Sequence, residues 1–252
     1  MNFDLSKTLN DFWGTEDPEC TSRQININPQ NTIEEYRWET LLTKEPETIE
    51  WIRRMNKSSI LLDVGANIGV YTLSALAHGV KHVIAFEPSP LSFSRLVSTL
   101  QTNQIFEHAS CFCCALSNQP DVIYFSHHLQ NQSGLAEFSQ TKTDQAKGGF
   151  PVVCEPLDIF EESTCFKNVT HMKIDVDGPE IEVLQGAAKL LNNPSLVSIL
   201  IECTEGQTDQ RAVELLAHFD FKIDTYYNQL PDHSINRRIK EGINARNLVF
   251  TR

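Results

Sequence analysis

The sequence predicts an α/β protein with one mainly parallel sheet that is covered by helices on both faces. From residue 59 onward, short apolar runs alternate with helical patterns, which is the order expected for such a sheet. The length of 252 residues suits one domain with a modest extension, and 40% hydrophobic residues suffice for a sizeable core. Ligands of such sheets bind beyond the carboxyl ends of the strands, so the residues that follow each strand are the candidates for function.

The elements are expected in the following order. Residues 1–31 are polar and read as irregular, and two short helices follow at 32–42 and 46–55, with Pro46 in a first helical turn. Strands are expected at 59–64, 82–86, 109–116, 121–125, 152–156, 168–176, 197–203, 221–227 and 247–251, and helices at 68–78, 92–103, 181–191 and 212–218. The polar stretch around 126–150 reads as an insertion between two arms of a hairpin.

The composition narrows the classes of partner. A formal net charge of −12 disfavours a large nucleic-acid-binding surface and adhesion to anionic membranes. No apolar run has the length of a membrane span, and the N-terminus does not have the pattern of a signal peptide. The seven cysteines are odd in number and lack a zinc-ligand spacing, which favours reduced thiols in a cytoplasmic protein. The oligomeric state leaves no signal in the sequence.

A glycine turn follows the first strand of the alternating region. Gly65 allows a tight turn, and Gly69 lets the next helix pack near the strand. A dinucleotide turn would carry another glycine where this chain has Asn67, and the carboxylate of Asp63 would repel a pyrophosphate. An acidic residue at this position favours a ligand that carries an ammonium or a sulfonium group.

A second acidic residue, Glu87, ends the next strand and can accept both hydroxyls of a ribose. The glycine turn and Glu87 together suit S-adenosylmethionine better than NAD. The alternative for each feature is plain: the glycines only shape a turn, and Glu87 is a solvated surface residue.

Residues 61–71, Leu-Leu-Asp-Val-Gly-Ala-Asn-Ile-Gly-Val-Tyr, resemble the S-adenosylmethionine turn of class I methyltransferases. Together with residues 173–180, Lys-Ile-Asp-Val-Asp-Gly-Pro-Glu, they resemble the FkbM family, as do residues 44–49 and 246–250. The resemblance covers about residues 35–251. It implies a Rossmann-like, seven-stranded sheet with an antiparallel last strand, S-adenosylmethionine as cofactor, and mostly O-methylation of small molecules or sugars.

The expected domain organisation follows from this resemblance. Residues 1–56 form an N-terminal extension whose short helices cover the cofactor site, and residues 57–252 form the methyltransferase domain. The stretch at residues 115–117 lies beside the adenine in this family. The expected cofactor-binding residues are Asp63, Gly65, Ala66, Asn67, Gly69, Tyr71, Glu87, Pro88, Ala115, Leu116, Ser117 and Thr48.

The candidate catalytic residues are two carboxylates at neighbouring strand ends, Asp175 first and Glu202 second. Asp175 can be the general base for an acceptor hydroxyl, a ligand of a divalent metal or an anchor for the methionine amino group. Asp177 lies two residues beyond Asp175, and it and Glu180 can equally stabilise the start of the next helix. Whether a metal is involved stays open, because carboxylates alone do not identify one.

The predicted function is S-adenosylmethionine-dependent methyl transfer, with a hydroxyl of a small molecule or saccharide as the expected acceptor. A catalytically silent S-adenosylmethionine-binding partner is the main alternative, and an NAD-linked enzyme is a weaker one because of the missing glycine. Nucleic acid is not expected as a substrate, and the sequence does not identify the acceptor.

Overall fold

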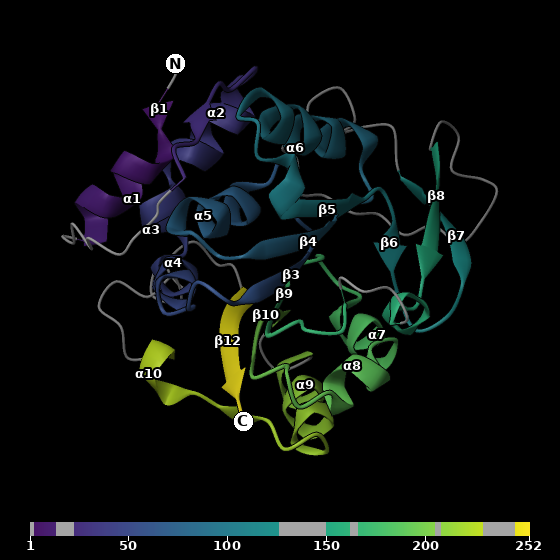
Figure 1. Cartoon of the computed structure of the whole chain (residues 1–252). Coiled ribbons are helices and arrows are strands. Elements are labelled where there is room, and N and C mark those ends of the chain that lie inside the picture. Colours follow the sequence, from purple (N-terminus) through teal and green to yellow (C-terminus); the bar gives the residue numbers. More distant parts are fainter. Residues whose placement is uncertain (1–2, 14–22, 126–149, 162–165, 205–207, 229–244) are drawn as a thin grey trace.

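A seven-stranded sheet forms the centre of the protein, in a computed structural model that describes residues 3–13, 23–125, 150–161, 166–204, 208–228 and 245–252 (Figure 1). Its strands lie in the order β11-β12-β10-β9-β3-β4-β5. Their bounds are β3 Ile60–Val64, β4 His82–Phe86, β5 Ala109–Phe112, β9 His171–Ile174, β10 Ser198–Thr204, β11 Lys222–Ile223 and β12 Ala245–Thr251. The last strand, β12, is antiparallel to both of its neighbours, and the other pairs are parallel. The predicted fold class is confirmed.

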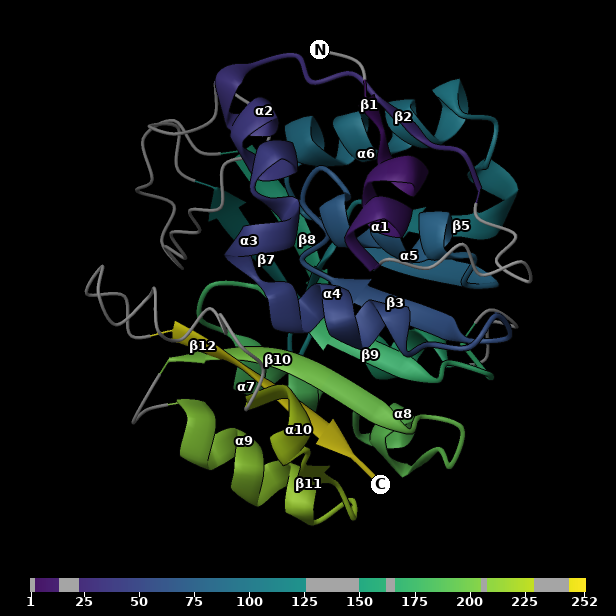
Figure 2. The same cartoon turned by 90° about the vertical axis from the view of Figure 1, so that its left-hand side faces the viewer.

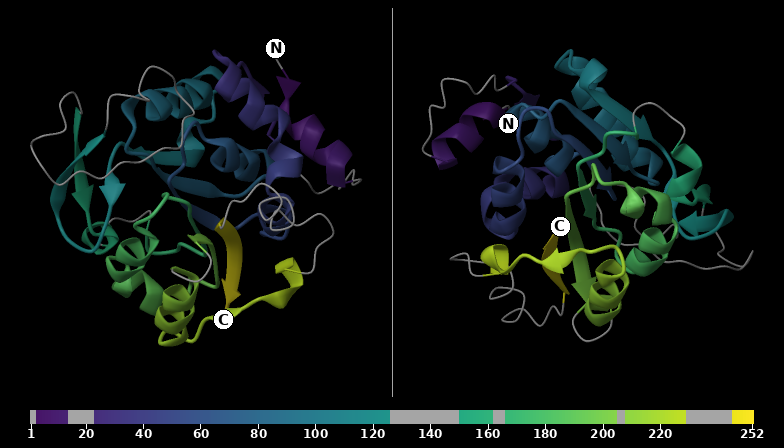
Figure 3. Two further views of the ribbon diagram at one scale, coloured as in Figure 1. Left: turned by 180° about the vertical axis from the view of Figure 1, so that it is seen from behind. Right: turned by 60° about the horizontal axis from the view of Figure 1, so that its bottom comes forward.

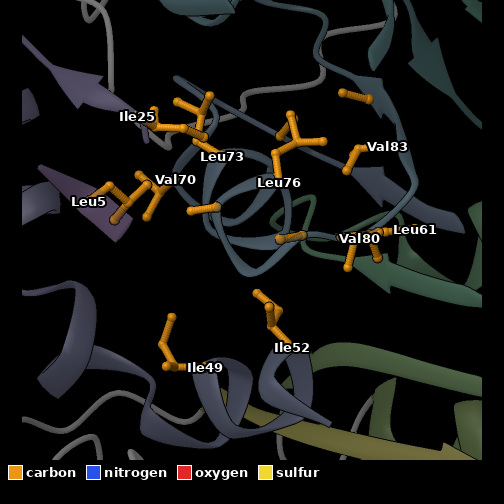
Figure 4. Close-up of a cluster of buried hydrophobic side chains, with 14 of the residues drawn as sticks. Leu5, Ile25, Ile49, Ile52, Leu61, Val70, Leu73, Leu76, Val80 and Val83 are labelled. Atoms are coloured by element: carbon orange, nitrogen blue, oxygen red, sulfur yellow. The ribbon is translucent and has the colours of Figure 1, made fainter. Parts of the chain in front are cut away.

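Helices cover both faces of this sheet, as Figures 2 and 3 show. One face packs against α1 Leu5–Trp13, α4 Pro46–Arg53, α5 Val70–His78, α6 Pro90–Thr102 and α10 Thr225–Asn228. Figure 4 shows part of the core on this side, where Leu73 and Leu76 of α5 lie among side chains of α1, α4 and the strands. The other face packs against α7 Glu180–Gln185, α8 Ala188–Asn192 and α9 Thr208–Ala217. No helix among these described segments has the length and apolar character needed to cross a bilayer.

The N-terminal region packs into the first of these cores. Residues 1–31 were expected to be irregular, and this expectation is wrong: α1 forms, and the short strands β1 Phe3–Asp4 and β2 Asn26–Ile27 pair with each other. Leu5 and Leu9, one helical turn apart, are fully buried and hold α1 in place. The two predicted helices appear as α2 Thr32–Glu39, α3 Leu41–Lys44 and α4.

Two polar contacts fix these helices. Trp51 on α4 donates from Nε1 to Oγ of Ser198 on β10 at 2.9 Å, and both side chains are buried. Glu34 on α2 pairs with Arg95 on α6 at 2.9 Å.

A second sheet, of three strands in the order β6-β8-β7, follows β5, the edge strand of the central sheet. The expected strand 109–116 breaks in two, because β5 ends at Phe112 and β6 Ala115–Leu116 leaves to pair with β8 Phe150–Glu155. The predicted hairpin is confirmed, since β7 Asp121–Phe125 pairs antiparallel with β8. Residues 126–149 of the expected insertion lie outside the described part of the chain.

Two further elements differ from expectation. The helix expected at 181–191 is divided at Gly186 into α7 and α8. A Cβ atom at Gly186 would lie 2.0 Å from the carbonyl oxygen of Ser117, so the close approach of these two segments needs a glycine. The strand expected at 221–227 is only β11, because the backbone N–H of Tyr226 donates to the side chain of Asp224 and α10 begins there.

Candidate functional site

The glycine turn after β3 is held against two neighbouring strands. The N–H groups of Gly65 and Ala66 both donate to the carbonyl oxygen of Phe86 on β4 at 2.9 Å. Gly65 has φ +83°, and a Cβ atom there would lie 1.9 Å from the carbonyl oxygen of Asp175. Only glycine therefore fits, and the turn lies directly beside the chain that follows β9.

Glu87 lies at the end of β4 with its carboxylate fixed beside this turn. Its Oε2 accepts from the N–H of Asn67 and its Oε1 from the N–H of Ser89, both at 2.7 Å. Burial raises the pKa of Glu87 to about 7, against these two hydrogen bonds, which lower it. A carboxylate held in this way retains acceptor capacity for hydroxyl groups, so Glu87 fits the predicted contact with a ribose.

Asp63 lies beneath the turn. It is 1% exposed, and its Oδ2 accepts from the hydroxyl of Thr72 at 2.6 Å. Its Oδ1 is buried without a hydrogen-bond partner among the described residues, and burial raises the pKa of the carboxyl group. A buried acceptor without a donor is costly. At 1% exposure Asp63 lies below the surface that a ligand would reach, so its predicted contact with the cofactor stays a prediction.

Three carboxylates meet just beyond β9 and on β10. One oxygen each of Asp175, Asp177 and Glu202 lie within 4.8 Å of one another. Asp177 has φ +54°, an uncommon conformation for a residue with a side chain, which turns the chain here toward α7. Burial, and then the charges of Asp175 and Glu180, raise the pKa of Asp177 to about 6. The predicted pair Asp175 and Glu202 is therefore brought together, with Asp177 as a third member.

Lys173 lies behind this group and was missed by the sequence reasoning. It is 1% exposed, and its Nζ lies 2.7 Å from Oδ2 of Asp175. Burial would raise the pKa of Asp175, but the charge of Lys173, followed by that of Lys44, outweighs burial and holds it well below its usual range. The available signal was a lysine between the apolar residues Met172 and Ile174 in a short core strand.

The residues predicted to contact the adenine divide into buried and accessible ones. Ala115 and Leu116 are buried, whereas Ser117 lines a cavity of about 310 Å³. The same cavity is lined by Asp177 and by Gly178, so it connects the end of β6 with the carboxylate group. Most of the side chains that line it are polar or acidic, so it favours a ligand that forms several hydrogen bonds.

The other predicted contacts lie at different depths. Tyr71 and Pro88 are partly exposed, and the Tyr71 ring lies beside Lys173. Thr48 is completely buried, and its hydroxyl donates to Glu45 at 3.3 Å and accepts from Asn247 at 3.4 Å. The burial of Thr48 does not favour direct contact with a cofactor, and the roles of all these residues stay predictions.

The carboxylate group of Asp175, Asp177 and Glu202 is partly neutralised by the protein itself. Asp175 already has a cation in contact, the ammonium group of Lys173. The three residues of this group can accept hydrogen bonds and protons.

Comparison with known proteins gives the family. Residues 63–228 match the Methyltransferase FkbM domain, which covers most of the sheet and every candidate residue except Thr48. A protein of Beauveria bassiana named Methyltransferase 1 is 25% identical over 145 residues, which are 51% of this chain and 58% of the fungal protein. The Hexuronic acid methyltransferase AglP of Haloferax volcanii is 25% identical over 195 residues, 74% of each chain.

Solved structures with a similar arrangement include an rRNA methylase from Streptococcus thermophilus, with a TM-score of 0.47 and 13% identity over 81% of this chain and 93% of that one. Another is a precorrin-6y C5,15-methyltransferase from Geobacter metallireducens, with a TM-score of 0.44 and 12% identity. The match covers 95% of this chain and 96% of that one. The domain match, which spans well over half of the residues, shows that the chain belongs to the FkbM methyltransferase family.

Proposed function

We propose that this chain transfers a methyl group from S-adenosylmethionine to a hydroxyl oxygen of a saccharide or similar small molecule. The observation that carries the proposal is the position of Asp175, whose backbone touches the Gly65 turn and whose side chain belongs to the group of three carboxylates. A cofactor bound at the turn and an acceptor bound at the carboxylates would therefore be neighbours, which is the main requirement of a displacement reaction.

The residues around the turn fit the cofactor. Glu87 would hold the ribose hydroxyls and the cavity at Ser117 would take the adenine, while the buried carboxylate of Asp63 would support the turn from beneath. When bound, S-adenosylmethionine supplies an activated methyl group on a sulfonium. We also infer that the N-terminal helices within residues 1–56 cover this site, since Lys44 lies close enough to lower the pKa of Asp175.

The carboxylates would handle the acceptor hydroxyl. Asp175 stays ionised at neutral pH, so it accepts a hydrogen bond from the hydroxyl and orients one oxygen lone pair toward the methyl group. A carboxylate with so low a pKa is a weak base. The proton would therefore pass within the group to Asp177, whose pKa of about 6 lies closer to neutral pH.

The choice of a sugar acceptor is supported by the Haloferax volcanii relative, which is named for a hexuronic acid. A saccharide offers several hydroxyl groups that are recognised through hydrogen bonds, so it does not need the extended basic surface that a nucleic acid needs and that a net charge of −12 disfavours. That the acceptor is not a nucleic acid stays a prediction.

The test is methyl transfer by the purified chain. The protein is incubated with S-adenosylmethionine and, separately, D-glucuronic acid, D-galacturonic acid, a neutral hexose and a short RNA, and products are followed by mass spectrometry. Methylation of a sugar hydroxyl, lost in Asp175→Asn although S-adenosylhomocysteine still binds, is the expected result. Methylation of the RNA instead, or of a nitrogen atom, would contradict the proposed acceptor.

A further inference from the structure

Lys173 is the only lysine that is buried among the described residues, and it lies in the middle of the sheet. Its neighbours on β9, Met172 and Ile174, belong to the core on the side of α7 and α8. Because side chains alternate along a strand, Lys173 extends to the opposite side, toward α4 and α5. Burial of an ammonium group costs free energy unless the group is paired with an anion. The groups that surround Lys173 therefore indicate its role.

Anionic and aromatic groups from separate parts of the chain surround the ammonium group. Asp175 contacts it at 2.7 Å, and the ring centre of Tyr71 on α5 lies 4.6 Å from Nζ. Asp63 is directly opposite Lys173 in the register of β3 and β9. Glu45, between α3 and α4, is 1% exposed and also interacts electrostatically with Lys173. The lysine thus connects the cofactor turn, the carboxylate group and the N-terminal helices.

Lys173 cannot act on a ligand directly, because no part of it reaches the surface to any useful extent. Asp175, in contrast, is 26% exposed and reaches the site. Any effect of the lysine on the reaction must therefore pass through its carboxylate partners.

We propose that Lys173 is a positioning residue for methyl transfer, whose buried ammonium group holds the Asp175 carboxylate beside the Gly65 turn and connects it to Asp63 and to Glu45. This inference rests on the proposed function, since it takes Asp175 to be the carboxylate that meets the acceptor. Without the ammonium group, several carboxylates would face one another in a poorly hydrated space, and at least one would take up a proton.

The protonation state of the Asp175 carboxyl group is the property that shows whether Lys173 has this role. The charged groups that face it are Lys173, Asp63, Glu202, Lys44, Asp177 and Glu180, of which the two lysines are the cations. Removal of the nearer cation leaves burial and the charges of Asp63, Asp177 and Glu180, which favour the protonated form, against the charge of Lys44 and the hydrogen bond with Glu202, which favour the ionised form. A protonated Asp175 donates a hydrogen bond to an acceptor hydroxyl instead of accepting one, and its side chain loses its fixed direction.

The test compares Lys173→Met and Lys173→Arg with the wild-type chain. The side-chain carboxyl resonance of Asp175, assigned by its loss in Asp175→Asn, is followed by ¹³C NMR as the pH is changed. We expect the pKa of Asp175 to rise above that of an ordinary aspartic acid in Lys173→Met and to stay low in Lys173→Arg. Lys189→Met is the matched control, because Lys189 pairs with Glu161 at 2.8 Å on the surface.

Binding and turnover provide the second readout. S-adenosylhomocysteine should bind Lys173→Met within about threefold of wild type, whereas kcat with the identified sugar should fall about 10²-fold, as for a misplaced catalytic group. In the Asp175→Asn background the same substitution should lower kcat no further, since the two residues act as one unit. An unchanged Asp175 pKa in Lys173→Met, or additive losses in the double variant, would overturn the proposal.

Two unwanted outcomes of this test are covered by further measurements. If Lys173→Met does not fold, Lys173→Gln keeps a polar side chain without the charge and is titrated in the same way, with the same expected and overturning results. If the wild-type chain methylates no acceptor, the proposed function fails, while the NMR titration still decides whether Lys173 controls Asp175. Loss of transfer in Asp175→Asn with full activity in Lys173→Met would reject the role of Lys173 alone.

Discussion

Substitution of Gly65 by alanine tests the claim that the cofactor turn is built directly against the end of β9. The backbone at Gly65 has φ +83°, and a residue with a side chain in a left-handed conformation loses about 1–2 kcal/mol. The new Cβ atom would also lie 1.9 Å from the carbonyl oxygen of Asp175, so one of the two backbone segments must move. Overpacking of this kind costs about 1–3 kcal/mol more, which gives a total of about 2–5 kcal/mol.

Gly69→Ala is the matched control. Gly69 also has a left-handed φ, of +88°, but a Cβ atom there meets the end of the flexible Leu96 side chain at 2.4 Å instead of backbone. The strain of the left-handed conformation is thus common to both variants. The difference between their losses in the free energy of unfolding compares an overlap with backbone at Asp175 with an overlap with a side-chain end at Leu96, and we expect Gly65→Ala to lose about 1 kcal/mol more.

The assay is urea denaturation of both variants, followed by calorimetric titration of the folded proteins with S-adenosylhomocysteine. Gly65→Ala should bind at least about tenfold more weakly than Gly69→Ala, because the displaced turn carries the cofactor contacts. A Gly65→Ala protein that is as stable as Gly69→Ala would refute the reasoning that the turn needs a glycine because of Asp175.

Three further predictions concern pH, the N-terminal helices and catalysis. Ionised Glu87 can accept from both ribose hydroxyls, whereas its protonated form has fewer free lone pairs. Because the pKa of Glu87 is about 7, affinity for S-adenosylhomocysteine should fall as the pH drops below 7 and level off above it, and calorimetry on Glu87→Gln should give weak binding without this slope. Asn247→Ala removes a 2.9 Å hydrogen bond to the fully buried Glu47 on α4 and should lower the free energy of unfolding by about 1–3 kcal/mol. Denaturant titration measures this loss, and an unchanged denaturation midpoint would show that the hydrogen bond to α4 is unimportant. Asp175→Asn should lower kcat about 10²–10⁴-fold with cofactor affinity retained, and an equal loss of both would assign Asp175 to binding alone.

The sequence predicted the central sheet because its strands are buried on both faces and alternate with helices. Ile60–Val64 and His82–Phe86 are short apolar runs that end in turn residues, and such runs need little tertiary information to be identified. The predicted meeting of Asp175 and Glu202 followed from the same rule, since the ends of neighbouring parallel strands lie together.

Other features depend on contacts that no local pattern records. The continuous run from residue 109 to 116 conceals the point where β6 leaves for the second sheet, which is decided by pairing with β8, far along the chain. Helix α1 forms because Leu5 and Leu9 find a surface on α5, although the surrounding sequence is polar. The burial of Lys173 likewise depends on three separate segments that bring carboxylates to it.

Calorimetric titration with S-adenosylhomocysteine tests the central claim most directly, that the strand ends around Gly65, Glu87 and Ser117 form the cofactor site. The wild-type chain should bind S-adenosylmethionine and S-adenosylhomocysteine but not NAD, and Glu87→Ala, which cannot accept the ribose hydroxyls, should bind both at least about tenfold more weakly. Folded wild-type protein that binds neither compound, or a Glu87→Ala protein with unchanged affinity, would contradict the assignment of the site.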